Sequence, residues 1–64
     1  MKLTAIVLGT NSRRVETHQL MVEAVTAGNI DAARDFLVRR AALLNLSMRD
    51  WSFERGEVRV WASA

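Results

Sequence analysis

The sequence predicts one small α+β domain over residues 1–64, in which a three-stranded antiparallel or mixed sheet carries a two-helix hairpin on one face. Three observations predict this β-α-α-β-β order. The chain opens on a short apolar run, continues through two stretches with apolar residues at helical spacing, and ends in a segment that pairs with itself around a turn. Gly9, Gly28 and Gly56 fall at the boundaries between these segments.

The apolar run at residues 2–8 predicts the first strand. Four large apolar residues occupy both phases of the β alternation: Leu3, Ile6, Val7 and Leu8. Because a strand that is apolar on both faces is normally buried on both, we expect this strand at the centre of the sheet. The run is similar to a short signal peptide, but Arg13 follows almost at once and cleavage would remove the best strand.

The middle of the chain predicts two helices. After a turn at residues 9–12, Asn11 or Ser12 is expected to cap a first helix that runs to about Ala27, with a later start at Glu16 as the alternative. Its apolar face consists of Leu20, Met21, Ala24 and Val25. Gly28 then serves as a left-handed C′ residue, and Asn29 caps a second helix over residues 30–45. That helix carries an apolar stripe formed by Ile30, Ala33, Phe36, Leu37, Ala41 and Leu44.

Residues 47–63 predict a β-hairpin that turns at Arg55-Gly56. This register pairs Glu54 with Glu57, Phe53 with Val58, Ser52 with Arg59, Trp51 with Val60, and Asp50 with Trp61. The apolar residues then match across the two strands on one face, as cross-strand packing requires. Arg-Gly is not a favoured two-residue turn, so a longer loop with the same pairing is the alternative.

The predicted layers leave one face of the sheet uncovered, since two helices cover only one face. Trp61 and Arg59 lie on the uncovered face, together with either Ile6 and Leu8 or Leu3 and Val7. We take Ile6, Leu8, Arg59 and Trp61 as the candidate interface. An exposed apolar patch on a small protein usually marks an interaction surface, so the sequence predicts a homodimer through this face.

Composition excludes several classes of site. The chain has no cysteine, one histidine and a formal net charge of +2, so disulfides and thiolate metal sites are excluded. No run approaches the ~20 apolar residues that span a bilayer, and we expect a cytoplasmic protein without membrane contact. On the predicted helix, Glu16 and His18 point in different directions. We therefore expect no catalytic or metal-binding residue, no cofactor and no enzymatic activity.

Arginines define a second set of candidate residues. Arg13 and Arg14 follow the turn at residues 9–12, where a helix start would favour an anion, although neither a P-loop nor a dinucleotide-binding motif is present. In the hairpin, Arg49, Arg55 and Arg59 accompany Trp61, a combination used by sites for single-stranded nucleic acid. Three acids interleave with them: Asp50, Glu54 and Glu57. The alternative for this segment is a mixed, solvated edge.

The predicted order resembles two nucleic-acid-binding folds. It is similar to the first five elements of a KH domain, but the loop that should read Gly-X-X-Gly is Gly28-Asn29-Ile30-Asp31 here. It also resembles a winged helix-turn-helix without its first helix, but Arg34 stands where an apolar residue is expected. Both resemblances rest on element order alone.

These observations favour a small intracellular protein-binding or regulatory module, of the accessory or inhibitor type that phages and plasmids also encode. Its partner is a protein of unknown identity, with a second copy of the chain as the first candidate. The alternative is a nucleic-acid-binding protein that uses Arg13, Arg14 and the arginines of the C-terminal hairpin.

Overall fold

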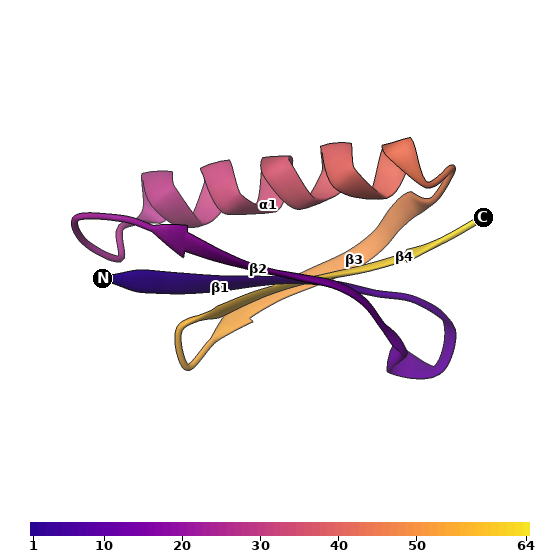
Figure 1. The fold of residues 1–64 in the computed structure, drawn as a ribbon, viewed down its shortest axis with the longest axis horizontal. Helices are drawn as coiled ribbons and strands as arrows, with labels where there is room; N and C mark the ends of the chain where they lie inside the picture. Colours follow the sequence, from indigo (N-terminus) through magenta and orange to yellow (C-terminus); the bar gives the residue numbers. More distant parts are fainter.

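The computed structural model describes all residues 1–64 and contains one four-stranded mixed sheet with a single helix on one face (Figure 1). The chain runs β1 (Lys2–Leu8), a 3-10 turn η1 (Thr10–Ser12), β2 (Arg14–Met21), α1 (Ala27–Leu43), β3 (Ser47–Glu54) and β4 (Glu57–Ser63). The strand order is β2-β1-β4-β3; β1 and β4 are parallel, and the two outer pairs are antiparallel. The β-α-α-β-β prediction with a two-helix hairpin and three strands is therefore wrong.

The error lies in the predicted first helix, because most of that segment is strand β2. Leu20 and Val22 pack against the core from the side that faces α1, while Thr17 and Gln19 alternate with them and are exposed. β1 is buried on both faces and needs hydrogen-bonding partners along both edges. Pairing with β2 supplies one of them, and this tertiary demand outweighs the helix propensity of the segment.

The single helix begins earlier than the prediction for residues 30–45. Thr26, not Asn29, is its N-cap, and the Thr26 Oγ1 accepts a hydrogen bond from the Asn29 backbone N–H at 3.1 Å. Gly28 therefore lies in the first turn of α1 and does not end a helix. At the other end, Asn45 adopts a left-handed φ of 61°, which stops the helix and leads into β3. With only one helix present, both resemblances to nucleic-acid-binding folds lose their basis.

The first strand and the C-terminal hairpin agree with the sequence predictions. β1 occupies residues 2–8 and lies inside the sheet, with Leu3 and residues 5–8 buried on both faces. All five predicted pairs of the β3–β4 hairpin occur in the predicted register. Arg55 and Gly56 form the two-residue turn, both with positive φ (53° and 74°), as a type I′ turn requires.

The core lies between α1 and the sheet. The helix presents a buried stripe at four-residue spacing, formed by Ala33, Leu37 and Ala41. The small alanines allow the helix to approach the sheet closely, and Leu37 fills the centre. The stripe packs on the covered-face residues of the two central strands: Leu3, Ala5 and Val7 of β1, and Val58, Val60 and Ala62 of β4. None of the helical segments has the length and hydrophobicity that crossing a bilayer requires.

Candidate interaction surface on the open sheet face

The face of the sheet away from α1, called the open face below, is built from three cross-strand rows. The strand pairings define each row from β2 through β1 and β4 to β3. The first row is Arg14, Leu8, Trp61 and Asp50; the second is Thr17, Ile6, Arg59 and Ser52; the third is Gln19, Thr4, Glu57 and Glu54. The structure thus brings the predicted interface residues Ile6, Leu8, Arg59 and Trp61 together in adjacent rows. Of the two predicted combinations, Ile6 and Leu8 occupy this face.

Two of these four residues do not reach the surface. Ile6 is 1% exposed and Leu8 is 8% exposed, although no helix covers them. The neighbouring side chains in their rows therefore cover them, and the turn η1 curls onto the same side of the sheet (Figure 1). Beside them a partner would meet the half-buried Arg59 and Trp61 side chains, and around these the exposed residues of the outer strands: Arg14, Thr17, Gln19, Asp50 and Glu54. The open face is consequently less apolar than the sequence suggests.

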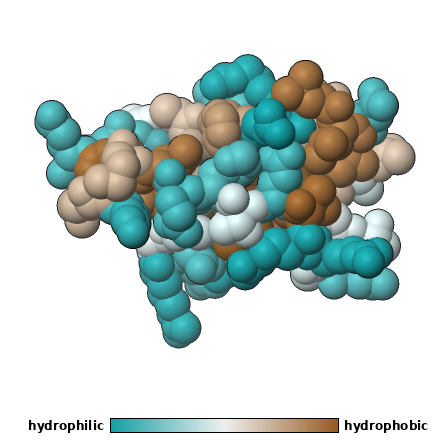
Figure 2. Space-filling view, in the orientation of Figure 1, coloured by the Kyte–Doolittle hydropathy of each residue, from teal (hydrophilic) through white to brown (hydrophobic).

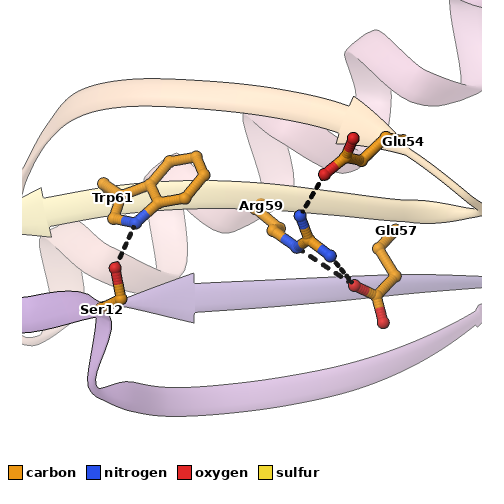
Figure 3. Close-up of polar contacts among 5 residues, drawn as sticks. All are labelled: Ser12, Glu54, Glu57, Arg59 and Trp61. Carbon is orange, nitrogen blue, oxygen red and sulfur yellow. Dashed lines mark hydrogen bonds and ion pairs between the residues drawn. The ribbon is translucent and has the colours of Figure 1, made fainter.

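Arg59 is held in place by two carboxylates (Figure 3). Its Nη1 donates to Glu54 Oε1 at 2.8 Å, and its Nε and Nη2 both donate to Glu57 Oε1. These bonds raise the pKa of Arg59 above its ordinary value, with the Glu57 hydrogen bond as the main cause. Glu54 and Glu57 stand directly opposite each other, so the guanidinium also relieves a like-charge pair.

The role of Glu54 and Glu57 was missed in the sequence analysis, although a signal for it exists. The predicted hairpin register already pairs the two glutamates and puts Arg59 on the same face, two residues from Glu57. A like-charged cross-strand pair requires a nearby cation, and Arg59 is the basic residue in reach.

Trp61 is fixed by the turn that follows β1. Its indole Nε1 donates a hydrogen bond to Ser12 Oγ at 3.2 Å, and both Trp61 and Arg59 lie on the side of the sheet opposite α1 (Figure 3). Asn11 and Ser12 have left-handed φ angles of 60° and 58°, a conformation that costs energy in residues other than glycine. The strained turn is what positions the Ser12 hydroxyl against the indole.

Beside Trp61, a shallow hollow of about 240 Å³ opens at the end of the sheet. Its walls are Gly9, Thr10, Arg49, Trp61, Ala62 and Ser63. Arg49 Nε donates to Ser63 Oγ at 2.9 Å, and its Nη2 donates to the Ala64 carbonyl at 2.9 Å. These bonds hold the exposed Arg49 guanidinium at the rim of the hollow. No local sequence pattern predicts this hollow, because it depends on the turn at Gly9 and Thr10.

The other candidate arginines separate into two groups. Arg13 and Arg14 are exposed where η1 joins β2, at the end of the sheet that also holds Arg49. Arg55 lies in the β3–β4 turn, at the opposite end. The expected helix start at Arg13 and Arg14 does not exist, so no helix dipole favours an anion there.

A second charged cluster links α1 to β2 on the covered side. The expectation that Glu16 and His18 diverge is wrong, because alternate residues of a strand share a face. Glu16 accepts hydrogen bonds from Arg40 (Nη2 to Oε2, 2.9 Å) and lies 2.7 Å from His18 Nε2. Arg40, and secondarily His18, lower the pKa of Glu16 to about 2. The His18 ring also packs edge-on against Phe36, with centroids 4.9 Å apart, so this cluster fastens the helix to the edge strand.

The exposed apolar side chains gather at the two ends of the molecule. Figure 2 shows them over the C-terminal end of α1 and, in a smaller group, near the N-terminus. Leu43 is the most exposed residue of the first group, at 72%, and Met21 of the second, at 73%.

No group of three or more histidine, aspartate or glutamate side chains could hold a metal ion. No family model, curated protein or solved structure matches the chain.

Proposed function

We propose that this chain is an intracellular protein-binding module, without enzymatic activity, whose partner surface is the open face. The observation that carries the proposal is a four-stranded sheet with one uncovered face, on which Arg59 and Trp61 stand in adjacent rows beside the buried, apolar Ile6 and Leu8. Tryptophan and arginine are the side chains most enriched at the energetic centres of protein interfaces.

The charge of the open face supports a protein partner. Arg59 is neutralised by Glu54 and Glu57, so the centre and one end of the face carry no excess of positive charge for a polyanion. Around the planar side chains lie short neutral polar ones, among them Thr4, Thr17 and Gln19. Aromatic and arginine side chains are enriched at protein interfaces, and polar side chains form the rim.

A second copy of the chain is the first partner we propose. The three rows of the open face hold two arginines and three acids, a net charge of only −1, so two copies can meet in a two-fold arrangement with little repulsion. A standard interface buries about 800 Å² per partner, which is about a fifth of the 4183 Å² surface of this chain. Self-association also stabilises small domains that lack disulfides or metals.

The test is light scattering coupled to gel filtration, over a concentration series from low to high micromolar. We expect a dimer that dissociates on dilution. Thr17→Arg, which adds a charge at an exposed position of the open face, should weaken the dimer about tenfold or more, as should Trp61→Ala. Circular dichroism checks that each variant folds, and Thr17→Arg does not disturb the core.

Leu43→Ala is the matched control, because Leu43 is exposed at the end of α1 and away from the open face. It should leave the dimer unchanged. If Leu43→Ala weakens the dimer and Thr17→Arg does not, the dimer interface lies at the C-terminal end of α1 and not on the open face. A monomer at every concentration would overturn self-association, and the proposal would then require a different protein whose capture Thr17→Arg abolishes and Leu43→Ala does not.

A further inference from the structure

The charges of the molecule separate between its two ends. At the end where β1, β4 and α1 finish, called the basic end below, five basic side chains face two acidic ones (right in Figure 1). The basic ones are Arg13, Arg14, Arg39, Arg40 and Arg49, and the acidic ones are Glu16 and Asp50. The charged side chains of this end therefore sum to +3. Those of the rest of the molecule sum to −1, and the two together give the formal net charge of +2.

Most of this positive charge is available to a ligand. Arg40 is engaged by Glu16, whereas Arg13, Arg14, Arg39 and Arg49 form no ion pair. All four are exposed. Unpaired guanidinium groups that cluster on one end of a small protein are suited to phosphate oxygens, which they bind through charge-assisted hydrogen bonds.

The hollow beside Trp61 opens at this same end. Trp61 is the aromatic residue among those that line it, and Arg49 stands beside it, fixed by Ser63 and the Ala64 carbonyl. Thr10 of the turn η1 also lines the hollow, and Ser12 of the same turn holds the Trp61 indole. An aromatic ring and an arginine that are both pre-positioned match a planar base and its neighbouring phosphate.

We infer that the basic end binds single-stranded nucleic acid, with one base in the hollow against Trp61 and the adjoining phosphates on Arg49 and Arg13. Base stacking on aromatic side chains combined with a basic track for the backbone is the general mode of such sites. The partner differs from that of the open-face proposal, and the two surfaces overlap in the first row of the open face, at Arg14, Trp61 and Asp50.

A strand fits this site better than a free small molecule does. The hollow is shallow, and its volume of about 240 Å³ lies below the roughly 300–1,000 Å³ of pockets that enclose a whole ligand. Arg14 and Arg39 lie outside its walls and can only contact a ligand that extends beyond it. Glu54 and Glu57, towards the opposite end of the open face, repel phosphates and confine the strand to the basic end.

The test is a fluorescence titration of Trp51→Phe, in which Trp61 is the sole tryptophan. Short mixed-sequence single-stranded DNA and RNA are added at low and at near-physiological salt. We expect saturable quenching that weakens with salt. Arg13→Ala should reduce the affinity several-fold and lower the salt slope by about 0.7 for the lost phosphate contact, because Arg13 touches neither the core nor the open face.

Arg55→Ala is the matched control, since it removes the same charge from an exposed site at the opposite end. It should change neither the affinity nor the salt slope. Equal losses in Arg13→Ala and Arg55→Ala would show diffuse charge attraction and overturn the site. Absence of quenching at low salt would also overturn it, and saturation by a mononucleotide as tight as that by a strand would replace the strand with a free nucleotide.

Discussion

On the covered face of the sheet, Leu37 of α1 fills the centre and Ala33 and Ala41 bring the helix close. On the open face, Ile6 and Leu8 are almost as completely buried, yet no helix lies over them. There their cross-strand neighbours are an arginine held by two glutamates and a tryptophan held by a serine. On one face, apolar packing between the helix and the sheet excludes water. On the other, we attribute the burial to amphipathic side chains whose polar ends form hydrogen bonds. The second kind of seal leaves polar groups at the surface, which suits a face that must also meet a partner.

The largest effect is expected on the covered face. Leu37→Ala should lower the free energy of unfolding by about 2–5 kcal/mol, because Leu37 is fully buried and its removal leaves a cavity between helix and sheet. Urea denaturation followed by circular dichroism measures the change. Leu43→Ala, at an exposed position of the same helix, should stay within about 0.5 kcal/mol of the wild type. A loss below about 1 kcal/mol for Leu37→Ala would mean that the helix is not the principal cover of the sheet.

Ile6→Ala tests whether the seal on the open face is as complete as its 1% exposure indicates. If Arg59 and its neighbours exclude water, this truncation should cost about 2–4 kcal/mol, close to the value for Leu37→Ala. The same denaturation measurement decides. Met21→Ala, at an exposed position of β2 paired with Lys2, serves as the control with little expected change. A cost for Ile6→Ala as small as that of Met21→Ala would show that water reaches the centre of the open face.

Arg59 allows the two components of the open-face seal to be separated. Arg59→Met keeps most of the aliphatic part of the side chain but leaves Glu54 and Glu57 opposed, and should lower the free energy of unfolding only modestly, because Arg59 is partly solvated. Arg59→Ala removes the cover as well and should cost more. Adding Glu57→Gln to Arg59→Met should restore part of the loss. Equal costs for the methionine and alanine variants would contradict the proposed covering role of the arginine stem.

The two hairpins show how far the sequence predicts this fold. In the β3–β4 hairpin, the partners are close in sequence and Trp51 and Phe53 match Val60 and Val58, so local pattern alone fixes register and faces. In the β1–β2 hairpin, the inward positions of β2 include the polar Glu16 and His18. The inward face of β2 can be recognised as such only when Arg40, which is 24 residues beyond Glu16, is known to pair with Glu16. A contact that distant carries no local signal, so the local pattern of this segment predicts a helix instead of a strand.

The candidate surface divides in the same way. The sequence placed Arg59 and Trp61 on the uncovered face because the hairpin register determines it. It could not show that both side chains are anchored over Ile6 and Leu8, which depends on the rows formed by the parallel pairing of β1 with β4. The hollow beside Trp61 depends on the left-handed turn at Asn11 and Ser12, a conformation that neither residue type dictates.

The smallest effect, and the one specific to the covered side, concerns pH. Glu16 has a pKa of about 2 in the folded chain against an ordinary value of 4.5, chiefly because Arg40 donates hydrogen bonds to its carboxylate. A carboxyl whose pKa is depressed by folding stabilises the fold above its unfolded value and loses that contribution as pH falls through the folded value. The free energy of unfolding should therefore decline between about pH 4.5 and pH 2, and Glu16→Gln should flatten this decline, as urea denaturation across that range will measure. Glu23→Gln, at an exposed glutamate without an ion pair, should leave the decline as in the wild type. Parallel curves for the wild type and Glu16→Gln would mean that the link from α1 to β2 is not formed in solution, and that the covered face relies on apolar packing alone.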